Sequence, residues 1–121
     1  MFKKLLIIFA LFAVNIVYAG SYEDALQKKG KVFLYFYAPQ CRTCKNFDTI
    51  FNSLKKQIPD YEFVRVNAET PYGMNLFLSF KGRYVPLIIL TDAKTKKSVS
   101  INHTCVMDEV CLARAMKSFK G

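Results

Sequence analysis

The run VFLYFY at residues 32–37 restricts the fold of this chain more than any other stretch, because its strand-forming residues leave no polar face. A strand of this kind is expected to be covered on both sides, as in a sheet with helices packed on both faces. After Pro39 the apolar residues take up helical spacing and predict one amphipathic helix from Cys41 to Gln57. The core is therefore predicted to contain a buried strand that leads directly into a helix.

The rest of the chain predicts an α/β domain in which helices and strands alternate. Helices are expected at 21–27, at 71–80 and from Asp108 onward, and strands at 61–66, 87–91 and 98–102. Ser21 is predicted to cap the first helix and Gly30 to end it. The order predicts a parallel βαβ unit followed by a ββα unit, since the short polar turn at 92–97 joins antiparallel strands.

Residues 1–19 are predicted to form a secretory signal peptide. Met1–Lys4 is a short basic head, Leu5–Val17 is apolar except for Asn15, and the small residue Ala19 offers a cleavage site before Gly20. The apolar run is shorter than the ~20 residues needed to span a bilayer, so an uncleaved membrane anchor is the less favoured alternative. Cleavage after Ala19 leaves residues 20–121, a length that suits one small domain.

The formal net charge is +9, yet its distribution indicates a solvated surface rather than a nucleic-acid interface. Lysines gather at 28–31 and 94–97 without the interleaved exposed aromatic residues that nucleic-acid surfaces carry. We therefore expect no nucleic-acid partner, whereas attraction to acidic lipid head groups stays open. The chain has four cysteines, an even number, so all of them can pair in an oxidising compartment.

Cys41 and Cys44 lie at the predicted junction of the buried strand and the helix N-terminus. A Cys-x-x-Cys pair near a βαβ pattern is typical of a thioredoxin-like redox motif, because the unpaired N–H groups of a helix N-terminus favour thiolate over thiol. We expect Cys41 to attack a disulfide and Cys44, less than one turn further along, to resolve the mixed disulfide. Arg42 and Lys45 either favour the thiolate further through their positive charge or only keep the helix surface soluble.

Three segments resemble thioredoxins and the thioredoxin-like domains of exported thiol-disulfide oxidoreductases. VFLYFYAPQCRTCK at 32–45 resembles their strand, turn and active-site helix, FVRVN at 63–67 their next strand, and RYVPLIIL at 83–90 the segment with their cis-proline. The resemblance implies that Pro86 is cis and faces the cysteine pair, and that the backbone of Val85 pairs with an extended substrate peptide. The residues alone also allow a trans proline at the start of a strand.

The chain departs from this family at three places around the cysteines. Gln40 stands where tryptophan is usual, so the surface that stacks against substrate is altered. Tyr35 replaces the buried acid that many thioredoxins carry in the preceding strand, and Arg42-Thr43 replaces Gly-Pro between the cysteines. Because this dipeptide tunes thiol acidity and potential in the family, the direction of electron flow is left open.

The resemblance also implies a sheet with fewer strands than usual. The stretch from Gly20 to Cys41 is too short for the family's first strand, helix and central strand. We therefore expect a thioredoxin-like fold with a central four-stranded mixed sheet flanked by helices. Its predicted strand order is 61–66, 32–37, 87–91 and 98–102, with the two most apolar strands in the centre.

The second cysteine pair, Cys105 and Cys111, is predicted to form a structural disulfide between the loop before the last helix and that helix. In the alternative, Cys105 exchanges with Cys41 and acts as a relay or regulatory thiol. His103 could join Cys41, Cys44 and Cys105 as metal ligands, but the spacing of the second pair lacks the pattern of a zinc knuckle. We expect neither a metal nor a cofactor.

Taken together, these patterns predict an exported thiol-disulfide oxidoreductase, located in the periplasm or secreted. It is expected to act as a monomer and as a reductant or electron carrier toward protein or small-molecule disulfides, with a membrane redox partner that recharges it. The alternative is a non-catalytic module of the same fold, in which two disulfides only stabilise the domain while its basic surface binds a protein or a metal ion.

Overall fold

Strand β1 (Lys31–Tyr37) lies inside a four-stranded sheet, between β2 (Glu62–Asn67) and β3 (Leu87–Asp92), and β4 (Lys97–Ser100) forms the edge beyond β3. Strands β1 and β2 are parallel, whereas the pairs β1/β3 and β3/β4 are antiparallel. The mixed sheet and its strand order confirm the prediction from the sequence. The computed structural model describes residues 20–120, so the predicted signal peptide lies outside the described residues.

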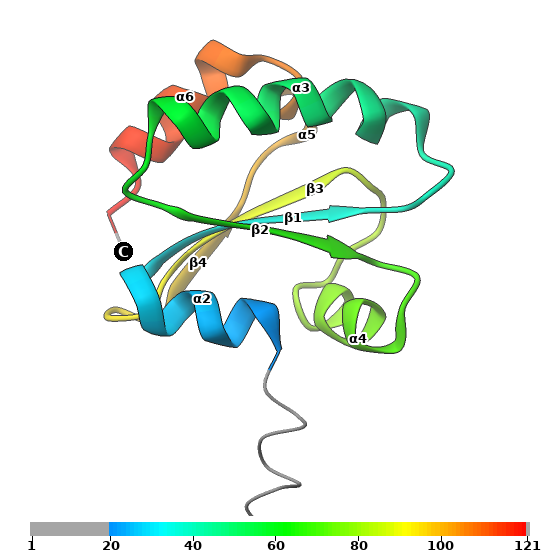
Figure 1. Cartoon of the computed structure of the whole chain (residues 1–121), viewed down its shortest axis with the longest axis horizontal. Coiled ribbons are helices and arrows are strands. Elements are labelled where there is room, and N and C mark those ends of the chain that lie inside the picture. The colour runs from blue at the N-terminus through cyan, green and yellow to red at the C-terminus, as the bar shows by residue number, and fades with distance from the viewer. Residues whose placement is uncertain (1–19, 121) are drawn as a thin grey trace, which may run out of the picture.

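Helices cover both faces of the sheet, as Figure 1 shows. One face carries α3 (Arg42–Gln57), α5 (His103–Val106) and α6 (Glu109–Ser118). The other face carries α2 (Ser21–Lys29) and α4 (Pro71–Ser79). Among residues 20–120, none of the helices has the length and apolar character needed to cross a membrane.

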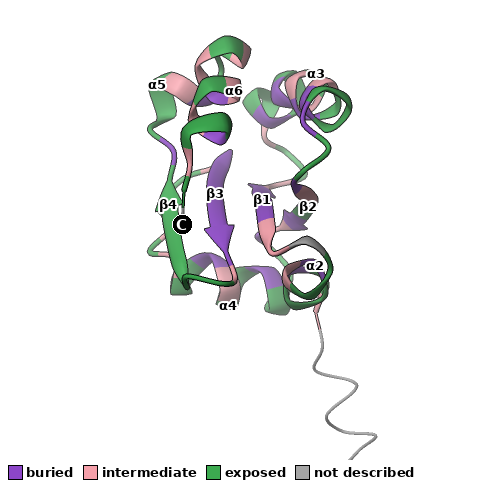
Figure 2. Ribbon diagram, turned by 90° about the vertical axis from the view of Figure 1, so that its left-hand side faces the viewer, coloured by how far each residue is buried: buried purple, intermediate pink, exposed green. Residues whose placement is uncertain are grey.

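The apolar run of β1 is explained by these two helical layers. Phe33 and Tyr35 belong to the core cluster beneath α3 and α6, whereas Val32, Leu34 and Phe36 belong to the cluster beneath α2 and α4. All five side chains are completely buried, because successive residues of a strand point to opposite faces. Figure 2 shows that β3 is also buried throughout, whereas the edge strand β4 is exposed.

Several element boundaries differ from the prediction. Gly20, not Ser21, is the N-cap of α2, and no side chain caps this helix, which extends to Lys29 and ends at Gly30 with a left-handed φ of 82°. The edge strand ends earlier than predicted because Ile101 turns into the core and only 8% of it is exposed. The short helix α5 was not predicted at all, since four residues carry no periodicity.

Candidate active site

The two cysteines of the first pair form a disulfide at the start of α3, with a Cα–Cα distance of 5.2 Å. Cys41 is the N-cap residue, and its sulfur accepts a hydrogen bond of 3.0 Å from the Cys44 N–H group. Cys41 is partly exposed, whereas only 1% of Cys44 is exposed. A substrate can therefore approach Cys41 but not Cys44.

The electrostatic environment of Cys41 is positive. The first turn of α3 contains no acidic residue, so the positive end of the helix dipole is not compensated there. Arg42 and Lys45 are exposed on this turn, and Gln40 is exposed just before it. In the reduced protein, this environment and the Cys44 N–H group are expected to favour a thiolate at Cys41.

The segment before β3 lies against the cysteine pair. The Val85–Pro86 peptide bond is cis, as the resemblance implies, and the Val85 carbonyl oxygen lies 3.9 Å from the Cys41 sulfur. Pro86 is buried and Val85 is half-buried. Within residues 20–120, the Val85 N–H group has no hydrogen-bond acceptor, so the backbone here is free to pair with an extended peptide.

A groove of about 410 Å³ runs alongside this segment. It is lined by Thr43, Tyr84, Val85, Pro86, His103, Val106 and Met107. Thr43 therefore faces a groove, unlike its neighbour Arg42, which does not line it. A second surface hollow, of about 560 Å³, lies between the end of α3 and α6 and contains neither cysteine of the first pair, so we do not assign it to the site.

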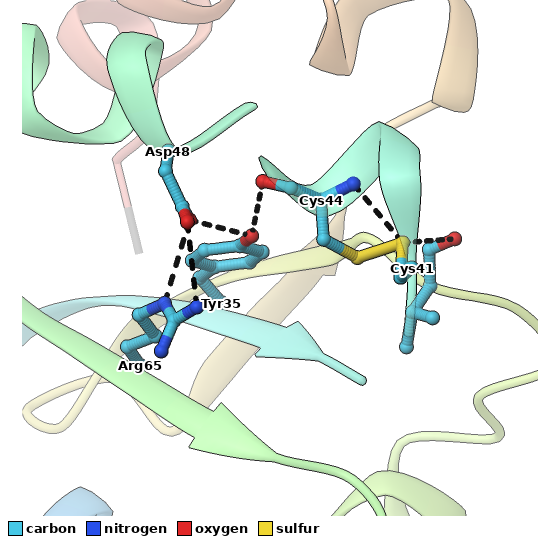
Figure 3. Close-up of a disulfide and its surroundings, with 6 residues drawn as sticks. Tyr35, Cys41, Cys44, Asp48 and Arg65 are labelled. Carbon is cyan, nitrogen blue, oxygen red and sulfur yellow. Dashed lines mark hydrogen bonds and ion pairs between the residues drawn. A yellow bond between two sulfur atoms is a disulfide. The ribbon is translucent and has the colours of Figure 1, made fainter. Parts of the chain in front are cut away.

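Tyr35 lies behind Cys44 and joins it to a polar cluster that the sequence did not predict (Figure 3). The Tyr35 hydroxyl is shared between two acceptors, the Cys44 carbonyl oxygen and Asp48 Oδ1, each 2.9 Å away. Asp48 in turn forms an ion pair of 3.4 Å with Arg65, whose guanidinium lies 3.5 Å from the centre of the Tyr37 ring. The cluster connects α3, β1 and β2 directly beside the disulfide.

Two sequence signals could have revealed this cluster. Asp48 follows Cys44 by four residues and therefore lies on the same side of α3. Arg65 is the register partner of Tyr35 in the parallel β1/β2 pair. The first signal is local, whereas the second depends on a strand register that the sequence alone does not specify.

Tyr35 supplies a hydrogen-bond donor where many thioredoxins carry an acid. Burial, followed by the hydrogen bond to Asp48, raises the pKa of Tyr35 far above its ordinary value of 10. Burial also raises the pKa of Tyr61 to about 12, and its hydroxyl donates to the Met116 carbonyl oxygen at 2.8 Å. Both hydroxyls therefore stay protonated and act as donors at neutral pH.

Replacement of Tyr35 by phenylalanine is expected to slow the resolving step about fivefold, because the hydroxyl no longer helps to position Cys44. This corresponds to an increase of about 1 kcal/mol in the activation free energy of that step. Tyr61→Phe is the matched control, because it removes a comparable buried bond to a backbone carbonyl far along the sheet. Each variant should lose about 1 kcal/mol of unfolding free energy in urea. Stopped-flow measurement of the Cys44-dependent release of the substrate thiol from the mixed disulfide distinguishes the two variants. Equal release rates in Tyr35→Phe and Tyr61→Phe would contradict a specific role for Tyr35.

The second pair forms a disulfide that joins α5 to α6, with a Cα–Cα distance of 5.4 Å. No cysteine among residues 20–120 is a free thiol. His103 contacts the Tyr84 ring edge-on at 6.0 Å between ring centres instead of gathering with the cysteines. In the part of the chain that the structure describes, no group of three or more His, Cys, Asp or Glu residues is placed to hold a metal ion.

These features together define a class of protein. A disulfide at a helix N-terminus, with one cysteine accessible, the other buried and a cis-proline segment beside them, is the arrangement of a thiol-disulfide exchange site. The comparisons with known proteins lead to the same class.

The family model for thioredoxin matches residues 13–109. A curated relative, putative thioredoxin-4 of Dictyostelium discoideum, is 36% identical over 84 residues, which cover 67% of this chain and 78% of the relative. Thioredoxin from Fasciola hepatica has a similar structure, with a TM-score of 0.67, 20% identity and coverage of 82% of this chain and 91% of its own. Oxidised mitochondrial thioredoxin 3 from Saccharomyces cerevisiae is also similar, with a TM-score of 0.67, 17% identity and coverage of 81% of this chain and 87% of its own. The chain belongs to the thioredoxin family, and with its Cys41-x-x-Cys44 pair it is a thiol-disulfide oxidoreductase.

Proposed function

We propose that this oxidoreductase is exported and works as a reductant or electron carrier toward protein and small-molecule disulfides. The observation that carries the exchange chemistry in this proposal is the unequal exposure of the cysteine pair, whereas the predicted signal peptide supports export. Cys41 is accessible and receives the Cys44 N–H hydrogen bond, whereas Cys44 is buried behind it. This asymmetry supports the attack by Cys41 and the resolution by Cys44.

The proposed reaction transfers two electrons in two exchange steps. The Cys41 thiolate attacks one sulfur of the substrate disulfide, a Cys41–substrate bond forms, and the other substrate sulfur leaves as a thiolate that takes up a proton. The Cys44 thiol then loses its proton and attacks the Cys41 sulfur, which releases the second substrate sulfur. The substrate disulfide is reduced and the Cys41–Cys44 bond is formed.

Repeated turnover requires electrons from a second protein that reduces the Cys41–Cys44 disulfide again. We assign this role to a membrane redox partner, because the sequence predicts export to a compartment where disulfides persist. The predicted signal peptide and the Cys105–Cys111 disulfide support this location, which is the periplasm or the exterior of the cell. The protein is proposed to act as a monomer.

Thiol trapping of the chain from Gly20 to Gly121 in graded glutathione buffers tests the proposal. The Cys41–Cys44 disulfide is expected to be reduced at a midpoint of about −270 mV, whereas a midpoint of about −120 mV would indicate an oxidant instead. The double variant Cys105→Ser/Cys111→Ser assigns the signal to the first pair. If that pair resisted reduction as strongly as Cys105–Cys111 and reduced no test disulfide, the non-catalytic module would be the better description.

A further inference from the structure

Lysines gather at the end of the sheet that lies opposite the cysteine pair. The last turns of α2 and α3, the end of α6 with the residues that follow it, and the hairpin of β3 and β4 all lie at this end, on the left in Figure 1. The chain reaches Cys41 at the other end of β1. Every lysine after Gly20 except Lys45 and Lys81 belongs to these segments or to the first residue of β1. We call this surface the lysine-rich end.

Hydrogen bonds and strand pairing hold these segments together. Strand pairing places Lys31 opposite Asp92. The Ala93 N–H group donates to the Gly30 carbonyl oxygen at 2.7 Å, which joins the hairpin to the end of α2. Lys31 Nζ donates to the Phe119 carbonyl oxygen at 3.2 Å, which joins β1 to the residues after α6. The lysines therefore belong to one surface of the fold rather than to separate loops.

Carboxylates do not neutralise the positive charge of the lysine-rich end. Among the side chains that the structure describes, the only ion pair joins Asp48 to Arg65, beside the cysteine pair. The turn from α3 into β2 adds Asp60 and Glu62 at the lysine-rich end, and Asp92 in the hairpin is only 8% exposed. The lysines outnumber these acids, so the surface attracts anions.

The lysine-rich end also lacks the apolar side chains on which protein interfaces are centred. The large apolar side chains that are exposed among residues 20–120 all lie in other segments, at Tyr72, Met74, Leu78, Tyr84, Val99, Met107 and Val110. Protein interfaces have an aromatic and apolar centre, whereas lysine clusters bind the acidic head groups of a bilayer by charge alone. Charge complementarity without apolar anchors therefore favours a lipid surface as the partner.

We propose that the lysine-rich end binds the anionic head groups of a lipid bilayer and holds the protein at the membrane with Cys41 directed away from the lipid. The exchange site lies at the other end of β1, so it stays open to substrate while the protein is bound. This inference goes beyond the proposed function, because it adds a partner that the exchange chemistry does not need. The attraction is electrostatic and is screened by salt.

Co-sedimentation of the oxidised chain from Gly20 to Gly121 with lipid vesicles tests the inference. The protein is expected to bind vesicles of phosphatidylcholine mixed with phosphatidylglycerol, not to bind vesicles of phosphatidylcholine alone, and to be released by about 1 M salt. Lys94→Gln/Lys96→Gln should weaken binding about twentyfold, because each lysine near an acidic bilayer contributes about fivefold in affinity.

Lys81→Gln/Arg83→Gln is the matched control, because it removes the same charge from two exposed residues just before the Val85–Pro86 segment, away from the lysine-rich end. It should change the affinity for anionic vesicles by less than about threefold. Circular dichroism checks that both double variants fold like the parent protein.

Equal weakening in the two double variants would show that only the net charge matters and would overturn the inference, as would equal binding to neutral and anionic vesicles. Tighter binding to soluble poly-L-glutamate than to anionic vesicles, at the same concentration of negative charge, would indicate an acidic protein as the partner and would also overturn it. None of these outcomes bears on disulfide exchange at Cys41, so the proposed function stands or falls separately, by thiol trapping.

Discussion

Replacement of Cys41 by serine is expected to lower kcat/KM for reduction of a test disulfide by at least about a thousandfold, because the variant lacks the attacking thiolate. Cys41 is the accessible member of the pair, and a serine hydroxyl has no tendency to ionise at neutral pH. The side chain remains nearly isosteric, and a hydroxyl at the N-cap of α3 still accepts a hydrogen bond from the Cys44 N–H group. The folded state should therefore persist while activity is lost.

Cys44→Ser is the matched variant, and it is expected to fail at a different step. The Cys41 thiolate still attacks, but no second thiol releases the substrate, so a mixed disulfide accumulates to one substrate per protein. Non-reducing electrophoresis and mass spectrometry of both variants after mixing with a peptide disulfide provide the measurement. Accumulation of the mixed disulfide on Cys41→Ser instead would reverse the roles of the two cysteines.

The sheet could be predicted because its signals are local. The runs at 32–37 and 87–90 are apolar on both faces, and the structure places the two strands that contain them side by side in the centre, where helices cover both sides. The short polar turn at 92–97 determines that β3 and β4 are antiparallel. None of these inferences depends on contacts between distant side chains.

The cluster behind Cys44 could not be predicted, because it depends on register. Tyr35 and Arg65 are 30 positions apart in the chain and meet only because β1 and β2 pair in one particular alignment. A shift of one residue would turn Arg65 to the opposite face of the sheet and leave Asp48 without its ion pair. The missing buried acid was visible in the sequence, whereas the hydroxyl–carboxylate pair beside the site required the fold.

Helix α5 could not be predicted from the sequence, for a different reason. The sequence suggested a loop before the last helix, since four residues are too few to show helical periodicity. Its beginning is marked only by Asn102, whose side chain accepts a hydrogen bond of 3.0 Å from the Thr104 N–H group. The disulfide was predicted from composition, but its place near the groove lined by Thr43, Val85 and Pro86 follows from the packing of α5 against β3 and α6.

Replacement of Phe47 by alanine is expected to destabilise the domain by about 3–5 kcal/mol, the cost of removing a large aromatic side chain from a core. Phe47 is completely buried, lies parallel to Phe33 at 6.4 Å between ring centres, and meets Tyr35 edge-on at 4.7 Å. Domains of this size have only about 5–15 kcal/mol of stability, so the loss is a large share of the total.

The same substitution links the core to the site, because Phe47 follows Cys44 by three residues on the buried side of α3. Urea denaturation of the oxidised protein measures the loss, and Asn52→Ala, an exposed position on the same helix, should change stability by less than about 0.5 kcal/mol. Phe47→Leu keeps most of the buried apolar area and should lose less than Phe47→Ala. A loss below about 1 kcal/mol for Phe47→Ala would mean that α3, and with it the cysteine pair, is held in place by something other than this aromatic core.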